Sequence, residues 1–596
     1  DTFVLCISVL LALAVRFDLA SIEKYLMMFS VSILVLVGLQ MLALIISGFY
    51  RSVLRHAGPE LLGLLLVSVI IGVGVFTLIN LTYIFHPMPR SIIVMSASFA
   101  FLGLLSLRLM VRWVVRLHLV EPRQISLLQN VVIYGAGSAG LQLFESLRQE
   151  GNYNILAFVD DNPRLQGGIL RGKSILSFSG LQKLNENKIL DSVLLALPGE
   201  KYEQRKKLLQ KLRTLKVGVR VLPTADQMMR GTVDVLKLQE VEIADLLGRD
   251  EIAPDEILLH QDIERCNVLV TGAGGSIGME LCSEILHNSP KTLVLLELNE
   301  LALYQAELAL KRLSNIPIVP CLGSVGDLKQ VKSLLKKHKI HTVYHAAAYK
   351  HVPLIEENPL QGLNNNVLGT QSLLTECMES GVGSFVLIST DKAVRPTSVM
   401  GASKRIAEMI VQDASVRFKG IKLGIVRFGN VLDSSGSVVP LFREQINKRM
   451  SITVTHPEIT RYFMSIGEAA RLVIQAGAMS KNGEVFLLDM GEPVKIHDLA
   501  VQMIELSGLI PEKDIPIKFT GLRPGEKLSE ELLIDPLQSQ PTKHPRIFCS
   551  KEGLPDSQIL SKKISALSEA IANRDISSAL NSMKRLVPEY NPDNSL

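Results

Sequence analysis

The apolar run at residues 268–270 leads directly into the sequence TGAGGSIG at residues 271–278. A short buried strand followed by TGxxGxxG predicts the first turn of a Rossmann fold, because glycine permits the tight turn and lets the backbone approach a pyrophosphate at the helix N-terminus. The cofactor contacts expected from this loop are Gly272, Gly275, Ser276, Ile277 and Gly278. A non-catalytic Rossmann scaffold would account for the glycines equally well.

The next apolar run, at residues 292–296, ends at Glu297. A carboxylate at this position can accept both ribose hydroxyl protons and would repel a 2'-phosphate, which favours NAD over NADP. A strand predicted at residues 316–320 leads to Asp327, which is expected near the adenine. Another at residues 342–345 leads to three alanines, among which Ala346 and Ala347 allow the cofactor to pass close to the backbone.

A second glycine pattern lies earlier in the chain. The apolar run at residues 131–134 leads into GAGSAG at residues 135–140, and a further strand ends near Asp160. We expect a small Rossmann-like domain at residues 125–225, without a cluster of acid, base or nucleophile. It would either bind a nucleotide or nucleotide sugar, or only space and dimerise the enzyme. Residues 226–262 are expected to form a linker.

Residues 1–112 contain four apolar stretches, near residues 2–15, 25–49, 61–85 and 92–107. About 20 apolar residues cross a bilayer core, so we predict four transmembrane helices, the first of them clipped because the chain begins at Asp1. Basic residues after the second and fourth stretches predict a multi-pass inner-membrane protein with its catalytic domain in the cytoplasm. No Asp or Glu lies inside a stretch, which indicates a membrane anchor and not a transporter.

Charge and cysteine content exclude other classes. A net charge of +5, from 63 basic and 58 acidic residues, is too small to indicate a nucleic-acid partner. The six cysteines form no C-x-x-C pair and have no histidines at zinc spacing, so neither a metal site nor a disulfide framework is expected.

Six motifs together resemble a known family. They are TGAGGSIG at 271–278, AAAYKHVP at 346–353, NNNVLGT at 364–370, STDKAVRPTSVMGASKR at 389–405, RFGNVLDSSGSV at 427–438 and GLRPGEK at 521–527. The chain resembles the extended short-chain dehydrogenase/reductase superfamily, and within it the membrane-anchored UDP-N-acetylglucosamine 4,6-dehydratases of bacterial polysaccharide and glycan biosynthesis. The resemblance implies two Rossmann-like, doubly wound parallel α/β domains after the membrane anchor. The NAD-dependent dehydratase domain would cover residues 263–545, before a helical extension at 546–596.

The superfamily ordinarily uses Tyr-x-x-x-Lys, in which the lysine lowers the pKa of the tyrosine and binds the nicotinamide ribose. This chain has Met400 and Lys404 at those positions. Lys404 can still bind the ribose, but Met400 cannot carry a proton. The proton of the C4 hydroxyl must therefore leave by another route, through Thr390, Asp391 or water.

The resemblance implies an elimination after C4 is oxidised to a ketone. Lys392 would be the base that removes the C5 proton, and Asp391 the acid that protonates the departing C6 hydroxyl. Hydride would then return to C6 and regenerate NAD. The alternative for this pair is an ordinary surface ion pair on a loop.

Substrate contacts follow from the same resemblance. Arg461 and Arg523 are expected at the diphosphate, and Asn430 and Lys350 in the same cleft, although each would be an ordinary surface residue without the family pattern. The expected substrate is a UDP-N-acetylhexosamine, most simply UDP-N-acetylglucosamine, and the expected assembly is a homo-oligomer.

Three other functions remain open at this stage. The first two are a nucleotide-sugar 4-epimerase, against which Met400 argues, and a dehydratase that acts on a different nucleotide sugar. The third is a polyisoprenyl-phosphate sugar transferase, in which the membrane helices would carry the chemistry.

Overall fold

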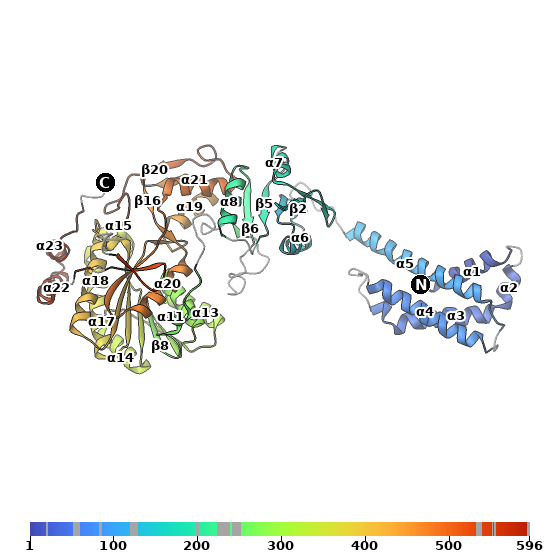
Figure 1. Ribbon diagram of the computed structural model, residues 1–596, viewed down its shortest axis with the longest axis horizontal. Coiled ribbons are helices and arrows are strands. Elements are labelled where there is room, and N and C mark those ends of the chain that lie inside the picture. Colours follow the sequence, from blue (N-terminus) through green and yellow to red (C-terminus); the bar gives the residue numbers. More distant parts are fainter. Residues whose placement is uncertain are drawn as a thin grey trace. The chain divides into compact units, whose positions relative to one another are not determined.

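The computed structural model contains all 596 residues and describes the chain except at residues 19–21, 52–59, 83–85, 120–128, 188, 198–201, 223–238, 241–251, 532–538, 551, 554–555 and 593–596. Most of the predicted linker at 226–262 therefore lies outside the described residues. The chain divides into two compact units, Asp1–Leu128 and Gln129–Leu596 (Figure 1).

Apolar helices make up the described part of the first unit. They are α1 (Thr2–Arg16), α2 (Ile22–Met28), α3 (Ser30–Ile46), α4 (Glu60–Asn80) and α5 (Arg90–Leu119). Helix α1 packs against α5 and α3 packs against α4. Arg108 of α5 forms an ion pair with Asp1 over 2.6 Å and stacks on the ring of Phe49.

The prediction of four transmembrane helices was wrong for the described residues. Two helices are long and apolar enough to cross a membrane, at Leu62–Asn80 and Arg90–Val111. A third span results only if α2 and α3, bent by 70° relative to each other, count as one. Helix α1 has 15 residues and a length of about 22 Å, whereas a bilayer core is about 30 Å thick. These helices indicate membrane association.

The second unit begins with a seven-stranded sheet in the order β3-β4-β2-β1-β5-β6-β7. Its five central strands are parallel, and β3 and β7 are antiparallel edge strands. The strands are β1 (Gln129–Tyr134), β2 (Tyr153–Val159), β3 (Ile169–Leu170), β4 (Lys173–Leu176), β5 (Ser192–Leu195), β6 (Gly218–Val221) and β7 (Gln239–Glu240). The accompanying helices are α6 (Ser138–Glu150), α7 (Phe178–Glu186) and α8 (Tyr202–Arg213).

A nine-stranded sheet follows, in the order β10-β9-β8-β11-β12-β13-β18-β22-β21. Seven strands are parallel: β8 (Asn267–Thr271), β9 (Thr292–Glu297), β10 (Ile318–Leu322), β11 (Thr342–His345), β12 (Ser384–Ile388), β13 (Lys422–Arg427) and β18 (Asn482–Leu488). Strands β22 (Ile547–Ser550) and β21 (Ser539–Pro541) add an antiparallel edge. Both sheets are doubly wound α/β structures, as the sequence predicted.

Helices cover both faces of the nine-stranded sheet. They include α12 (Ser276–His287), α13 (Glu300–Leu313), α14 (Leu328–His338), α17 (Gly369–Glu379), α18 (Val399–Arg417) and α20 (Ile466–Met479). From β8 the chain adds β9 and β10 on one side of the sheet, and from β11 it adds β12 and β13 on the other. Open α/β sheets bind their ligands at such a reversal of strand order, here between β8 and β11. The C-terminal helices α22 (Ser557–Ala572) and α23 (Ile576–Leu586) pack against the same core as α18.

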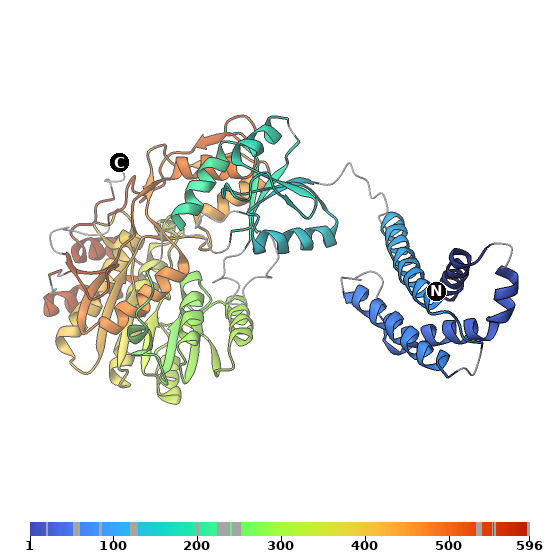
Figure 2. The same cartoon turned by 45° about the vertical axis from the view of Figure 1, so that its right-hand side comes forward.

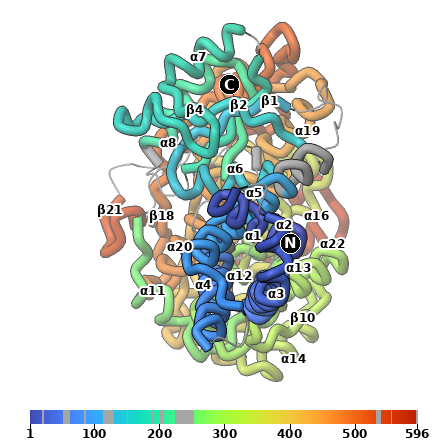
Figure 3. The backbone as a smooth tube through the Cα atoms, turned by 90° about the vertical axis from the view of Figure 1, so that its right-hand side faces the viewer, coloured from blue at the N-terminus to red at the C-terminus, as the bar shows by residue number. Residues whose placement is uncertain are grey.

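The two sheets form separate blocks of strands (Figure 2). Helix α21 (Ile496–Leu506) packs against α8 and β6 and, together with α19 (Val438–Asn447), shares an apolar core with the first sheet (Figure 1). In Figure 3, strands β1, β2 and β4 of the first sheet lie at one end of the second unit and α14 lies at the other. Arg213 of α8 forms an ion pair with Glu505 of α21 over 2.6 Å. The second unit is therefore one packed body and not two domains on a loose tether.

A buried ion cluster lies where α18 packs on β13. The fully buried guanidinium of Arg427 bonds both carboxylate oxygens of Glu408, at 2.6 and 2.5 Å, and also contacts Glu552. Burial disfavours the carboxylate of Glu408, but Arg427 and Arg405 outweigh this effect and lower its pKa to about 2. Glu408 also accepts a hydrogen bond from Ser389 over 2.6 Å.

Replacing Arg427 with methionine should strongly destabilise the second unit, because it leaves two buried carboxylates without their main partner. Removing one partner of a buried pair costs about 3–5 kcal/mol, so we expect a drop of about 3–5 °C in the unfolding midpoint measured by scanning calorimetry. The matched control is Lys448→Met, which breaks the exposed pair Lys448–Glu444 and should cost less than about 1 kcal/mol. Equal midpoints for the two variants would contradict this account.

Candidate active site

The glycine loop at 271–278 closes tightly between β8 and α12. Gly272 has a φ of +66°, which favours glycine, and a Cβ atom added to Gly278 would lie 2.0 Å from the carbonyl oxygen of Gly272. The loop therefore has no room for side chains at these positions, and it leaves the N-terminus of α12 open to an anion. Ser276 is held by the neighbouring loop, since its Oγ accepts a hydrogen bond from the Ser435 amide over 3.0 Å.

Glu297 lies at the end of β9, beside this loop. One carboxylate oxygen accepts a hydrogen bond from the Gly274 amide over 3.0 Å, and the other accepts from the amides of Leu298 and Asn299. The backbone of Ala347 passes within 2.8 Å of where a Cβ of Gly272 would lie. A cradle without side chains, with a carboxylate at its rim, fits the dinucleotide expected from the sequence. NAD(P) binding is typical of this fold.

Asp327 has a structural role in this region. Its carboxylate caps α14 by accepting a hydrogen bond from the Gln330 amide over 3.1 Å. Ala346 follows β11, and its amide donates to the carbonyl oxygen of Thr271. Contact between Asp327 and an adenine remains a prediction.

Met400 and Lys404 lie one turn apart on α18. Met400 is buried in the apolar core, and Lys404 is 6% exposed. Burial lowers the pKa of Lys404 to about 8, although Glu408 opposes the shift. No proton donor replaces the usual tyrosine at the position of Met400.

Thr390, Asp391 and Lys392 form a hydrogen-bonded chain directly after β12. The Thr390 hydroxyl donates to Asp391 Oδ1 over 2.7 Å, and Lys392 Nζ donates to the same oxygen over 3.0 Å. Lys392 Nζ also donates to Asn430 Oδ1 over 3.2 Å. The carboxylate of Asp391 is fully buried, so this is not an exposed surface pair.

A cavity of about 260 Å³ opens beside Lys392. It is lined by residues from several separate segments of the chain, and the sequence-predicted substrate contacts all border it, namely Lys350, Asn430, Arg461 and Arg523. Arg523 has no side-chain hydrogen bond or ion pair to another described residue, so its guanidinium is available to an anion. The N-terminal ends of α19 and α21 border the same cavity at Ser437 and Ile496.

Arg461 is already engaged by the loop that carries Arg523. Its guanidinium donates to the carbonyl oxygens of Thr460, Lys527 and Leu528 at 2.7–3.2 Å. These bonds fix the loop at 521–528, so Arg461 positions Arg523 as well as bordering the cavity.

Glu530 is a cavity residue that the sequence analysis missed. Its side chain is 3% exposed, and one carboxylate oxygen lies 3.6 Å from Lys392 Nζ. Glu530 follows GLRPGEK by three residues and is remote from Lys392 in sequence, so no local pattern connects the two. The only available signal was its place after the motif GLRPGEK.

The glycine loop at residues 135–140 makes a tight turn similar to that of the loop at 271–278. Gly135 has a φ of +108°, and a Cβ on Gly140 would lie 1.9 Å from the Gly135 carbonyl oxygen. Asp160 accepts a hydrogen bond from the Ala136 amide over 2.8 Å, as Glu297 does from Gly274. Whether this loop binds a nucleotide remains a prediction.

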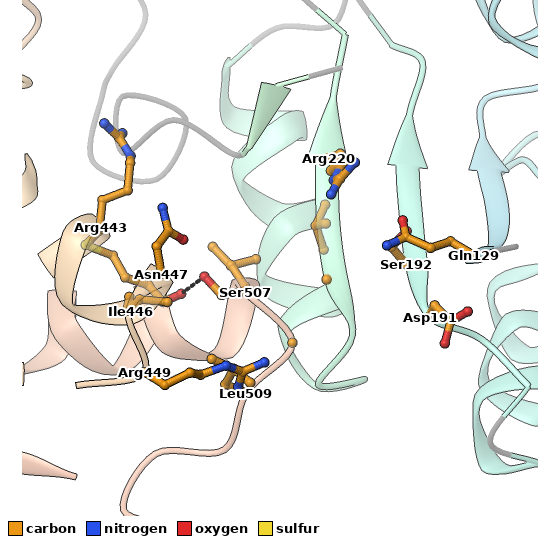
Figure 4. A pocket seen from close by; sticks show the side chains of 15 residues that line it. Gln129, Asp191, Ser192, Arg220, Arg443, Ile446, Asn447, Arg449, Ser507 and Leu509 are labelled. Atoms are coloured by element: carbon orange, nitrogen blue, oxygen red, sulfur yellow. Dashed lines mark hydrogen bonds between the residues drawn. The ribbon is translucent and has the colours of Figure 1, made fainter. Parts of the chain in front are cut away.

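A second cavity, of about 430 Å³, lies between the first sheet and the helices α19 and α21 (Figure 4). Arg443, Ile446 and Asn447 of α19 border it on one side, and Asp191 and Arg220 of the first sheet's segments border it on the other. The C-terminal ends of α19 and α21 reach this cavity, while their N-terminal ends reach the first one. These two helices therefore connect the cavities.

Comparison with known sequences gives two family matches. The family described as "Polysaccharide biosynthesis protein" matches residues 268–552, and the family described as "CoA-binding domain" matches residues 45–223. The first match covers the nine-stranded sheet up to β22 and its glycine loop.

Individual relatives extend this result. Capsular polysaccharide biosynthesis protein CapD of Staphylococcus aureus is 40% identical over 408 residues, which are 67% of this chain and 68% of CapD. A UDP-glucose 4-epimerase of Rickettsia canadensis is 32% identical over 274 residues, and an inverting UDP-N-acetylglucosamine 4,6-dehydratase of Campylobacter jejuni is 30% identical over 275 residues. Each of these two matches covers 45% of this chain and 77% of the relative. The chain belongs to the polysaccharide biosynthesis protein family that includes CapD, related to the nucleotide-sugar dehydratases and epimerases of the short-chain dehydrogenase/reductase superfamily.

Proposed function

We propose that this chain catalyses the NAD-dependent 4,6-dehydration of a UDP-N-acetylhexosamine, with UDP-N-acetylglucosamine as the first candidate. The product would be a UDP-4-keto-6-deoxy sugar for polysaccharide biosynthesis. The observation that supports this most directly is the chain of Thr390, Asp391 and Lys392 beside the cavity, combined with Met400 where a simple dehydrogenase needs tyrosine. The helices of the first unit would anchor the enzyme at the cytoplasmic face of the inner membrane.

The residues of the second glycine loop, with Glu297 and Lys404, would hold the cofactor. When bound, NAD supplies an acceptor for the hydride of sugar C4 and a donor that returns it to C6. Glu297 would receive the adenosine ribose, and its negative charge disfavours a 2'-phosphate. Lys404 would donate to the nicotinamide ribose.

The C4 hydroxyl proton would leave through Thr390. Its hydroxyl already donates to Asp391 over 2.7 Å, so it can pass a proton to that carboxylate while accepting one from the sugar. This route takes over the proton transfer for which the superfamily uses a tyrosine at the position of Met400. It leaves Asp391 protonated next to Lys392. Together Asp391 and Lys392 would then serve the loss of water from C5 and C6.

Two cations would bind the diphosphate. The guanidinium of Arg523 has no hydrogen bond or ion pair to another described residue, and its fork matches phosphate oxygens; Lys350 borders the same cavity. Arg461 would act mainly by fixing the loop that carries Arg523.

A nucleotide-sugar 4-epimerase is the second candidate, because a UDP-glucose 4-epimerase is among the relatives. An epimerase removes and returns a hydride at C4 alone and has no use for an acid–base pair at C5 and C6. Met400 also removes the phenol on which the ordinary C4 chemistry of the superfamily depends.

Incubation of the full-length chain in detergent with UDP-N-acetylglucosamine should give a product lighter by one water. Mass spectrometry detects the mass loss, and proton NMR should show a new C6 methyl group. A product of unchanged mass would instead identify an epimerase. No change in this sugar, together with turnover of another nucleotide sugar, would correct the proposed substrate.

Lys392→Met should abolish water loss. The ammonium group of Lys392 donates a hydrogen bond to Asp391 and borders the cavity, and methionine keeps neither the charge nor the hydrogen bond. We expect at least a 100-fold drop in kcat, the usual scale for losing a proton-transfer group. Lys448→Met, an exposed lysine on α19, serves as the matched control and should retain full activity. Normal turnover by Lys392→Met would contradict the assignment.

The affinity for NAD should fall as the pH rises through about 8. Below that value Lys404 is an ammonium group and makes a charge-assisted hydrogen bond, and above it the amine is neutral. The loss should be about fivefold, corresponding to ~1 kcal/mol. Titration calorimetry between pH 6.5 and 9.5 measures it, and Lys404→Arg, which stays charged, should show a flat profile. A flat wild-type profile would contradict the role of Lys404.

A further inference from the structure

Glu530 has an unusual environment for an acidic side chain. It is nearly fully buried, yet it borders the substrate cavity. One oxygen lies 3.6 Å from Lys392 Nζ, and the other is buried without a hydrogen-bond partner among the described residues. A buried carboxylate oxygen without a partner is costly unless a ligand group meets it.

Lys392 is poorly suited to act as a resting base. Burial disfavours its ammonium form, but Asp391 and Glu530 outweigh that effect and the opposing charge of Arg461, so the pKa of Lys392 is raised above its ordinary value. An amine accepts a proton only when it is neutral. Before Lys392 could act as a base, its ammonium group would have to lose a proton, and the two neighbouring carboxylates stabilise the charged form.

The other acidic groups near the cavity either lie behind Lys392 or are already hydrogen-bonded. Asp391 is fully buried behind Lys392 and does not border the cavity. Glu526 borders it, but its oxygens accept hydrogen bonds from Thr455, Arg461 and the Arg523 amide. Among the described cavity residues, Glu530 is the carboxylate with a free oxygen.

We infer that Glu530 removes the C5 proton and that Lys392 is the acid that protonates the departing C6 hydroxyl. This inference rests on the proposed dehydration and reverses the roles expected for Lys392 from sequence resemblance. Lys392 then already holds, before the sugar binds, the proton that it donates.

The elimination step balances without a further reactant. The C5–H bond breaks, its proton passes to a Glu530 oxygen, and its electron pair forms the C5=C6 double bond conjugated with the C4 ketone. The C6–O bond breaks, and the oxygen leaves as water with a proton from Lys392 Nζ. Asp391 has by then received the proton of the C4 hydroxyl through Thr390. It passes this proton to Lys392 Nζ along their 3.0 Å hydrogen bond, which restores the ammonium group.

The test is a comparison of Glu530→Gln with wild type in deuterated water, using the full chain and UDP-N-acetylglucosamine. Wild type should release product that carries deuterium at C5. Glu530→Gln should oxidise C4, seen as the absorbance of reduced nicotinamide, but form product at least about 100-fold more slowly. Glu530→Asp should restore part of the rate, because a carboxylate remains.

Glu531→Gln is the matched control. Glu531 carries the same charge one residue later, but its side chain is 44% exposed and pairs with Arg395. This variant should turn over like wild type. A large loss in both variants would show that the surrounding loop, and not the Glu530 carboxylate, is responsible, and it would overturn the inference.

Two other results would also overturn it. If Glu530 only keeps Lys392 charged, Glu530→Gln will still eliminate water, with its pH optimum shifted to lower pH. If Glu530 is needed for C4 oxidation, reduced nicotinamide will not appear in the variant. Failure of the proposed function itself looks different, because wild type would then form no product lighter by one water.

Discussion

The catalytic end of the second sheet depends on one buried carboxylate, that of Glu408. It binds Ser389 at the end of β12, Arg427 at the end of β13 and Arg405 on its own helix. Ser389 directly precedes Thr390, and the same helix carries Met400 and Lys404. A displacement of the end of β13 would leave a charge unpaired in the core, and a displacement of the end of β12 would break the hydrogen bond from Ser389. The spacing between the chain of Thr390, Asp391 and Lys392 and the side chain of Lys404 is therefore set by this buried ion cluster.

Sequence patterns located the residues whose role depends on backbone geometry. The glycine turns, Glu297 and the strand at Thr342–His345 lie as predicted, because short buried strands and tight turns leave a local signature. Strand β10 begins two residues later than expected, since its register is set by pairing with β9 and not by its own apolar residues. The membrane helices were overcounted, because apolar composition does not show that α1 is short or that α2 and α3 are bent.

The parts of the site that the sequence did not reveal depend on contacts between distant segments. Arg461 was expected at the diphosphate, but its hydrogen bonds go to the backbone of the loop at 521–528. Glu530 becomes a candidate only because its carboxylate lies 3.6 Å from Lys392 Nζ. Its negative charge in turn helps to raise the pKa of Lys392. Residue types alone suggest an acid–base pair, whereas the assignment of acid and base needs the charges that surround it.

The apolar core that the first sheet shares with α19 and α21 limits where this chain can be divided. Leu212 of α8, Phe442 of α19 and Met503 of α21 belong to one buried cluster. Cutting the chain between the sheets would expose the apolar faces of α19 and α21 to water and favour aggregation. The first sheet thus covers the apolar faces of α19 and α21, whose N-terminal ends border the cavity beside Lys392. A change on α8 that loosened this contact would therefore also loosen two helices that line that cavity.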